Sequence, residues 1–137
     1  MREIFVLDAC ALLALVKKEK GADIVSEIYK KARRGDALLY MSRVNLLEVY
    51  YGFYRDMGHS FARDIIRQVE SSPVLITDFD RDVFWEAGRL KGSYKMSLAD
   101  AIAIAQTIIL RGSILTADHH EFDVLESKEP LHFTWIR

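Results

Sequence analysis

The chain has 137 residues, half of them hydrophobic, and a formal net charge of −1 at pH 7. This length and apolar content suffice for one domain, residues 1–137, with its own core, and the few glycines and prolines exclude disorder and collagen-like repeats. The near-zero charge excludes a general attraction to nucleic acid, so any contact with DNA or RNA must be local.

The first third of the chain predicts one strand and two helices. Residues 4–7 are a short apolar run of the kind found in strands buried on both faces, and the run ends at Asp8. Residues 11–16 then predict a short helix. Apolar residues recur at helical spacing between charged ones over residues 22–34, which predicts a second, amphipathic helix.

The middle of the chain predicts a strand, a helical hairpin and another strand. Residues 38–41 are a second short apolar run, and Ser42 is a suitable N-cap for a helix that ends near Gly58. A further amphipathic helix covers residues 61–69, and the short connection before it predicts an antiparallel pair of helices. Residues 74–76 predict the third strand.

The last third predicts three helices and two strands. Asp80 caps a helix whose apolar face carries Val83, Phe84, Ala87 and Leu90. Residues 98–110 are apolar nearly all round, so this helix must be central. Residues 114–116 predict a fourth strand, residues 119–125 a short helix, and residues 131–135 a fifth strand.

The alternation of strands and helices predicts an α/β fold with a mainly parallel sheet, because parallel neighbours need crossover connections. In open sheets of this kind, ligands bind beyond the carboxyl ends of the strands. Asp8 and Asp118 lie at or just beyond the ends of the first and fourth strands. A site is therefore expected at this edge of the sheet.

Four carboxylates point to such a site, and each also has a structural explanation. Asp8 and Asp118 are suitable helix caps, and Asp100 matches a capping box that begins at Ser97. Glu48 lies among large apolar neighbours, either on a narrow polar stripe or half buried. Independent caps would not need to converge, whereas two strand ends and two helix beginnings can meet at one edge of a parallel sheet.

A bound cation would explain why these acids lie in apolar surroundings. Asp100 is the only charged residue between Ser97 and Leu110, and burying an unpaired carboxylate is costly. Hard oxygen ligands favour Mg²⁺ or Mn²⁺. The four histidines and the one cysteine show no zinc-ligand spacing, so structural zinc is not expected.

The single cysteine, Cys10, cannot form an intrachain disulfide, which agrees with a reducing compartment. Asp8 interrupts the first apolar stretch before it reaches the length of a signal peptide. Asp100 likewise interrupts the stretch from residue 98 to 105, which is too short to span a bilayer. We therefore expect a soluble, cytoplasmic protein with no membrane segment.

Four segments occur in order along nearly the whole chain, each weak alone but fairly specific together. They are Phe5-Val6-Leu7-Asp8-Ala9, Asn45-Leu46-Leu47-Glu48-Val49, Ser97-Leu98-Ala99-Asp100-Ala101-Ile102-Ala103-Ile104-Ala105 and Ile114-Leu115-Thr116-Ala117-Asp118. In these segments the sequence resembles the PIN domain, and especially the VapC-type toxins of toxin–antitoxin pairs.

The resemblance implies a three-layer α/β/α sandwich, a homodimer, cleavage of RNA that depends on Mg²⁺ or Mn²⁺, and inhibition by a small antitoxin protein. It assigns the metal-binding acids to Asp8, Glu48, Asp100 and Asp118. The sequence departs from many relatives at Cys10, where they have a small hydroxyl residue. The aromatic residue that follows Thr116-Ala117-Asp118 is Phe122, one position later than in many relatives. This shift leaves open whether Asp123 joins the site.

The resulting hypothesis is an endoribonuclease whose metal ions lower the pKa of a bound water and stabilise charge on the phosphate. Thr116 is a candidate for orienting a water or the phosphate. Arg43, at the start of the helix that carries Glu48, is either a phosphate contact or an ordinary surface arginine.

Two alternatives stay open. A haloacid-dehalogenase-type phosphatase would use Asp8 as its nucleophile, but that family has a second aspartate two residues later, where this chain has Cys10. A degenerate PIN-like domain would bind RNA or protein without cutting, and the retention of all four acids speaks against it.

The helix that carries Tyr50, Tyr51, Phe53 and Tyr54 has more apolar area than one buried face can use. We expect the excess to lie in a subunit or partner interface, of which a homodimer is the simplest form.

Overall fold

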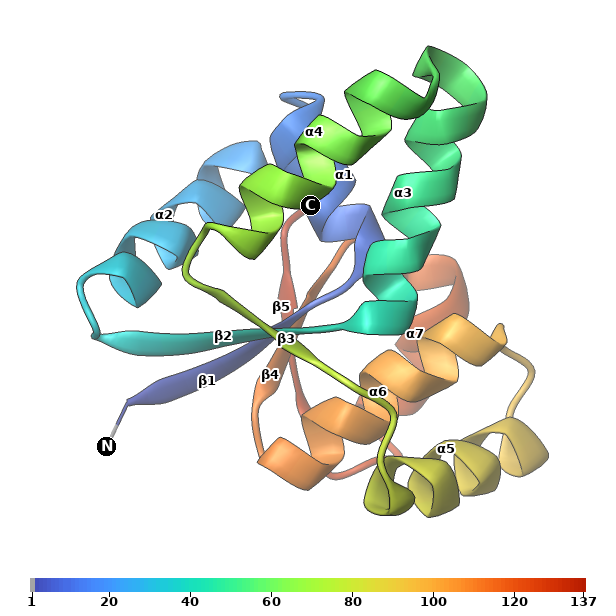
Figure 1. The fold of residues 1–137 in the computed structure, drawn as a ribbon. Helices are drawn as coiled ribbons and strands as arrows, with labels where there is room; N and C mark the ends of the chain where they lie inside the picture. The colour runs from blue at the N-terminus through green and yellow to red at the C-terminus, as the bar shows by residue number, and fades with distance from the viewer. Residues whose placement is uncertain (1) are drawn as a thin grey trace.

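The computed structural model describes residues 2–137, in which strands and helices alternate (Figure 1). The strands are β1 (Glu3–Leu7), β2 (Ala37–Ser42), β3 (Val74–Thr77), β4 (Ser113–Thr116) and β5 (His132–Trp135). The helices are α1 (Ala9–Val16), α2 (Ala22–Arg33), α3 (Arg43–Met57), α4 (His59–Glu70), α5 (Arg81–Ser93), α6 (Leu98–Leu110) and α7 (His119–Glu126). Every strand and helix predicted from the sequence is present, with ends that shift by a few residues.

The strands form one sheet in the order β3-β2-β1-β4-β5, and every neighbouring pair is parallel. The chain winds outward from β1 through β2 to β3 and then returns to the other side of β1 to add β4 and β5. Because crossovers between parallel strands are right-handed, this reversal places the earlier and the later helices on opposite faces. A ligand crevice is expected beyond the carboxyl ends of β1 and β4, where the winding reverses.

The helices cover the sheet on two sides, with α1 to α4 on one face and α5 to α7 on the other (Figure 1). One apolar cluster joins Leu7, Leu39 and Met41 of the sheet to the first group of helices. A second cluster joins Ile114 to residues of α5, α6 and α7. The predicted three-layer α/β/α sandwich with a parallel sheet is therefore confirmed.

Helix α6 lies in the middle of the second layer, as its apolar composition predicted. From Ala99 to Thr107 every residue is buried except Asp100, which is partly exposed. Asp100 thus emerges from an otherwise buried stretch of α6, at the end that faces the carboxyl edge of β1.

The prediction for α5 was wrong at one residue. Val83, Ala87 and Leu90 are buried at the spacing of one helical face, but Phe84 is 52% exposed. Phe84 follows Val83 by one residue, about 100° around the helix, and so falls beside the face that packs on α6. Its ring instead contacts the rings of Phe79 and Trp85, at centroid distances of 6.3 and 5.0 Å.

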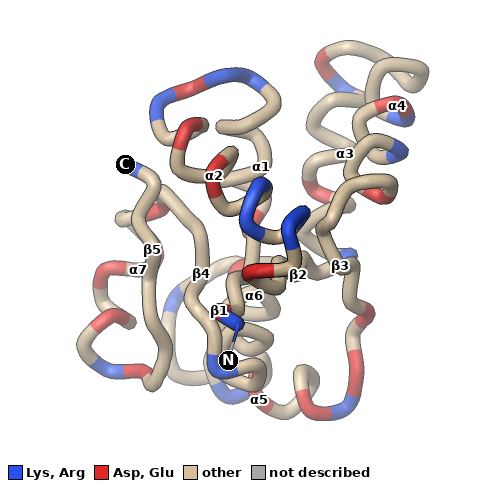
Figure 2. The backbone as a smooth tube through the Cα atoms, turned by 90° about the vertical axis from the view of Figure 1, so that its left-hand side faces the viewer, with Lys and Arg blue, Asp and Glu red and all other residues tan. Residues whose placement is uncertain are grey.

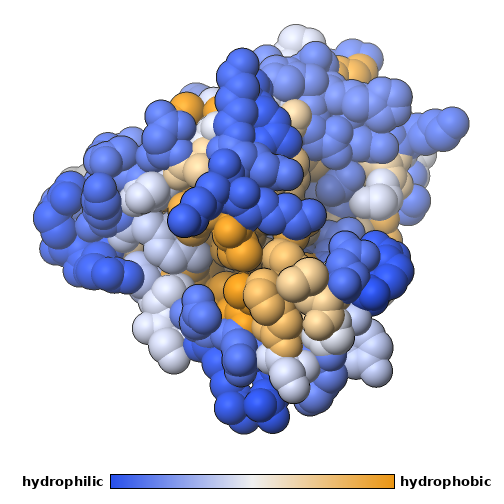
Figure 3. Space-filling model, turned by 90° about the horizontal axis from the view of Figure 1, so that it is seen from above, coloured by the Kyte–Doolittle hydropathy of each residue, from blue (hydrophilic) through white to orange (hydrophobic). Residues whose placement is uncertain are grey.

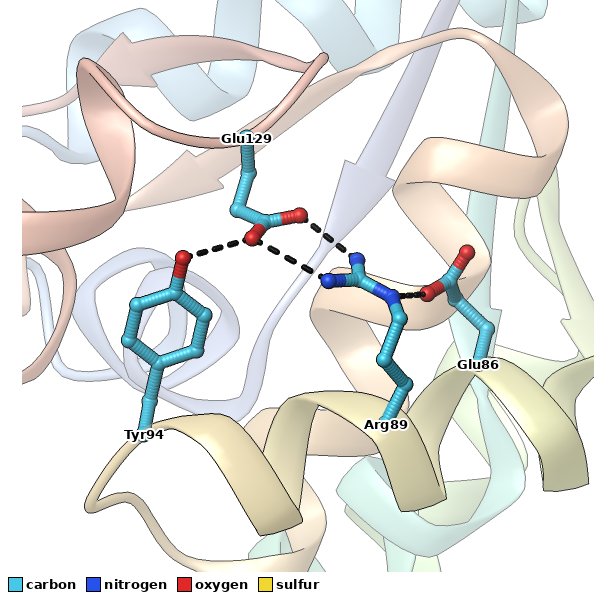
Figure 4. A network of polar contacts seen from close by, with 4 residues as sticks. All are labelled: Glu86, Arg89, Tyr94 and Glu129. Atoms are coloured by element: carbon cyan, nitrogen blue, oxygen red, sulfur yellow. Dashed lines mark hydrogen bonds and ion pairs between the residues drawn. The ribbon is translucent and has the colours of Figure 1, made fainter.

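A polar network fastens α5 to the loop before β5 (Figure 4). Arg89 donates two hydrogen bonds to Glu129, of 2.6 and 3.3 Å, and a further one to Glu86. The Tyr94 hydroxyl donates to Glu129 at 2.6 Å. The Glu129 side chain is only 6% exposed, and its bonds with Arg89 hold its pKa below the ordinary value.

Charged residues of both signs are interspersed along the backbone (Figure 2), in keeping with the near-zero net charge. Seen from above, apolar residues gather in a patch framed by hydrophilic ones (Figure 3). Within residues 2–137, no helix has the length and apolar content needed to cross a membrane.

Candidate metal centre

The candidate site begins where β1 and β4 end side by side. Leu7 pairs with Leu115 in the sheet, and the Asp8 amide donates to the Leu115 carbonyl at 3.4 Å. Asp8 follows β1 directly, and Thr116 and Asp118 follow the corresponding point of β4. The parallel register therefore brings Asp8 and Asp118 to the same edge of the sheet, as the sequence predicted.

Asp8 is a buried acid that serves as a helix cap. The residue is 2% exposed, and Oδ1 accepts a hydrogen bond of 2.8 Å from the Ala11 amide at the start of α1. The pKa of Asp8 is raised to about 7, chiefly by burial and also by the Asp100 and Asp118 carboxylates, while hydrogen bonds from the Thr116 hydroxyl and the Ala11 amide oppose the rise. Asp8 thus lies within electrostatic reach of two other acids.

Asp100 brings the beginning of α6 to the same place. Its amide donates to the Ser97 hydroxyl at 3.1 Å, so the predicted capping interaction exists. Burial raises the pKa of Asp100 to about 6, with contributions from the charges of Asp118, Glu48 and Glu121. Capping and convergence therefore occur together at this residue.

Glu48 reaches the site from α3. It is partly buried, and Oε1 accepts a 3.2 Å hydrogen bond from the Asn45 side-chain amide, one turn earlier on the same helix. Burial raises the pKa of Glu48, while the Asn45 bond opposes this. Its charge acts on Asp100, which places Glu48 on the α6 side of the site.

Asp118 and Thr116 complete the edge. Asp118 Oδ1 accepts from the Glu121 amide at 3.2 Å and caps α7. The Asp118 amide donates to Thr116 Oγ1 at 3.0 Å, and the Thr116 side chain is fully buried. The Thr116 hydroxyl also acts on the Asp8 carboxylate, whose pKa it lowers.

The chemistry of this donor set fits Mg²⁺ or Mn²⁺, because all the convergent groups are carboxylate oxygens and the charges that act on Asp8 and Asp100 are negative. Across residues 2–137, no three Asp, Glu, His or Cys side chains stand close enough together to form a ready metal cage. Asp8, Asp118 and Glu48 each use one oxygen for a local hydrogen bond.

The supporting residues named from the sequence lie further out. Arg43 is exposed and forms a 2.7 Å ion pair with Asp78 beyond β3. Asp123 is exposed and pairs with His119 at 2.8 Å. Neither of these ion pairs involves any of the four acids.

Sequence reasoning missed Glu121, whose charge acts on Asp100. Glu121 lies three residues after Asp118, one turn along α7 and on the same side. That spacing was the available signal, and it was hidden because an acid at this position also belongs to an ordinary helix beginning.

The PIN domain family model matches residues 5–127, a span that contains all four acids and most of the sheet. This chain belongs to the PIN domain family. Among curated protein sequences, none matches significantly.

Solved structures with the same fold include toxin–antitoxin assemblies. A DNA-bound VapBC from Salmonella typhimurium aligns with a TM-score of 0.77 at 14% identity, over 100% of both chains. VapBC2 from Rickettsia felis, bound to a promoter DNA fragment, gives 0.76 at 16% identity, over 96% of this chain and 98% of that one. A toxin–antitoxin complex from Klebsiella pneumoniae gives 0.67 at 19% identity, over 93% and 98%. These identities establish a shared fold.

Proposed function

We propose that this chain is a cytoplasmic, metal-dependent endoribonuclease, the toxin of a toxin–antitoxin pair, acting as a single domain. The observation that carries the proposal is the convergence of Asp8, Asp100 and Asp118, with Glu48 beside them, at the edge where the sheet reverses its winding. These carboxylates repel one another in the empty chain, and a divalent cation relieves that repulsion.

Asp8, Glu48, Asp100 and Asp118 would hold the Mg²⁺ or Mn²⁺, with Glu121 adding negative charge. The ion would lower the pKa of water and stabilise charge on the phosphodiester. The chain itself fixes the acids on strand ends and helix caps, so their positions are set before substrate binds. Thr116 would hold Asp8 and the Asp118 backbone at a constant spacing.

The antitoxin part of the proposal is supported by the similar structures, which are named as toxin–antitoxin complexes. It is also supported by an apolar groove of about 390 Å³ between α1, α2 and α4. The groove is lined by Leu12, Leu15, Val16, Phe61 and Ile65, among others. An apolar segment of a small protein would fill it.

The proposal is tested by RNA cleavage with millimolar Mn²⁺ or with chelator. Wild type is expected to cleave only with metal, and Asp100→Asn to be slower by roughly 100-fold or more. Asp82→Asn is the matched control, because Asp82 also lies in the first turn of a helix, α5, but is exposed there. It is expected to cleave at the wild-type rate.

Melting curves separate loss of the site from loss of the fold. Mn²⁺ is expected to raise the melting temperature of wild type and Asp82→Asn, and to raise that of Asp100→Asn much less. If Asp100→Asn cleaved RNA like wild type and shifted equally with metal, Asp100 would be only a helix cap and the proposed site would be wrong.

A further inference from the structure

Asn45 is a buried polar side chain that is tied to the candidate site without being an acid. It is fully buried in α3, three residues before Glu48 and on the same side of the helix. Its Nδ2 donates to Glu48 Oε1 at 3.2 Å and to the backbone carbonyl of Ala99 at 3.5 Å. Ala99 directly precedes Asp100, so one amide group joins the two helices that carry these acids.

The orientation of the Asn45 amide follows from its two neighbours. Both are acceptors, so Nδ2 must face them, and turning the amide over would place Oδ1 against a carboxylate and a carbonyl. In this orientation Oδ1 is buried without a protein partner within residues 2–137. A buried acceptor without a partner is costly, and an apolar side chain of similar size would fill the space without that cost. The amide is therefore explained by the acceptors it joins.

The absence of charge on Asn45 also suits this position. A lysine or arginine would hold Glu48 more strongly, but its positive charge would compete with a bound cation. A neutral amide fixes one oxygen of Glu48 and leaves the negative charge available. It also holds Glu48 near Asp100, whose charge repels it.

We propose that Asn45 is a positioning residue that holds Glu48 against the first turn of α6, in the place required for binding a divalent cation. This inference rests on the proposed function, because it assumes that Glu48 binds the cation. Asn45 acts through Glu48 and touches neither metal nor substrate.

The experiment is a double-mutant cycle on Mn²⁺ affinity, measured by calorimetry on the full chain without RNA. The proteins are wild type, Asn45→Leu, Glu48→Gln and the double variant. Each single variant is expected to bind Mn²⁺ roughly 10- to 100-fold more weakly. The double variant is expected to bind no more weakly than Glu48→Gln alone, since Asn45 has nothing left to position.

Gln106 provides a matched control. It is a second buried amide, on α6, with an unpartnered Oε1, but its Nε2 donates to Thr77 at the end of β3. Gln106→Leu is expected to keep wild-type Mn²⁺ affinity. An equal loss in Gln106→Leu and Asn45→Leu would show a general packing effect and overturn the inference.

Further outcomes separate this inference from the proposed function. If wild type binds Mn²⁺ but the losses in Asn45→Leu and Glu48→Gln add fully, Asn45 does not act through Glu48 and only this inference fails. If wild type binds no Mn²⁺, the proposed function and the inference fail together. Should Asn45→Leu not fold, Asn45→Ser replaces it in the cycle, because its shorter side chain cannot span both acceptors, and the same expectations apply.

Discussion

At Asp8, one carboxylate has two roles that conflict in the absence of metal. As an N-cap it stabilises α1 through the Ala11 amide, but as a buried acid it is costly to ionise. Asparagine caps a helix about as well and carries no charge. The substitution Asp8→Asn therefore separates the two roles.

We expect metal-free Asp8→Asn to be more stable than wild type at pH 8, by on the order of 1–4 kcal/mol. The pKa of Asp8 is about 7 in the folded chain against an ordinary value of 3.8, so the folded state holds a proton that the unfolded state releases. This stabilisation is complete below about pH 4 and is lost as pH rises to 7. Chemical denaturation in chelator from pH 4 to 8 measures it, and identical slopes for both proteins would contradict the raised pKa.

Helix α7 offers a direct comparison between two acids that lie two residues apart. Glu121 acts on Asp100, whereas Asp123 is exposed and paired with His119. We expect Glu121→Gln to weaken Mn²⁺ binding by roughly tenfold, equivalent to about 1.4 kcal/mol, and Asp123→Asn to leave it unchanged. Calorimetric titration of both variants checks this. A larger loss in Asp123→Asn would return Asp123 to the site in place of Glu121.

Site residues that are marked by their neighbours in the sequence could be predicted. A site residue whose contacts lie far along the chain was missed. Asp8 and Asp118 follow recognisable strands, so their meeting could be inferred from the rules of parallel sheets. Asn45 could not be interpreted in this way, because one of its partners, the Ala99 carbonyl, lies 54 residues further along the chain. Neither apolar periodicity nor a sequence motif indicates such a contact.

At the scale of elements, the network around Arg89 connects parts of the chain that the sheet does not join. Arg89 and Tyr94, at the end of α5, hold the almost fully buried Glu129 of the loop before β5 (Figure 4). Removing Arg89 would leave a buried carboxylate with one neutral donor. Because Arg89 itself is 46% exposed, the cost lies between that of a surface ion pair and that of a fully buried one.

We expect Arg89→Met to destabilise the fold by about 1–2 kcal/mol at pH 7. Because the Arg89 bonds lower the pKa of Glu129, their contribution is present above the ordinary value of 4.5 and is lost as pH falls through the lower folded value. The difference from wild type should therefore shrink in acid. Urea unfolding at pH 7 and pH 3.5 measures both effects, with Lys128→Met as an exposed control next to Glu129. A constant difference at both pH values would rule out the ion pair as the cause.

The elements themselves were predictable because propensity, capping and apolar periodicity agree along most of the chain. Ser42 and Asp80 cap α3 and α5 as the sequence indicated. Phe84 was misplaced because periodicity reports which residues are apolar, whereas exposure depends on how wide a face the neighbouring helix covers. That width is set by the packing of α5 on α6, which the sequence of α5 alone does not contain.

For the whole molecule, the order of the strands explains the position of the site. Because β1 is central and the chain reverses beside it, residues more than 100 positions apart, Asp8 and Asp118, reach one edge. The same topology leaves the outer faces of α3 and α5 unpaired. Tyr51 and Tyr54 are about half exposed on α3, as are Phe84 and Trp85 on α5.

The predicted excess of apolar area on α3 is found at only some of the named residues. Phe53 is buried in the core, and Tyr50 is partly buried and hydrogen-bonded to His59 at 3.0 Å. Tyr51 and Tyr54 remain exposed, and Leu47 continues their stripe at helical spacing. This stripe is the surface on which self-association is expected.

We therefore expect wild type to sediment as a dimer at micromolar concentration. The double variant Tyr51→Lys/Tyr54→Lys should sediment as a monomer, because a symmetric interface would bury each new charge against its own copy. The melting temperature of the dilute protein should change little, since both side chains point away from the core. Trp85→Lys is the control on the other exposed surface and should remain dimeric. Dissociation by Trp85→Lys alone would place the interface on α5, and a wild-type monomer without added partner would contradict self-association through either helix.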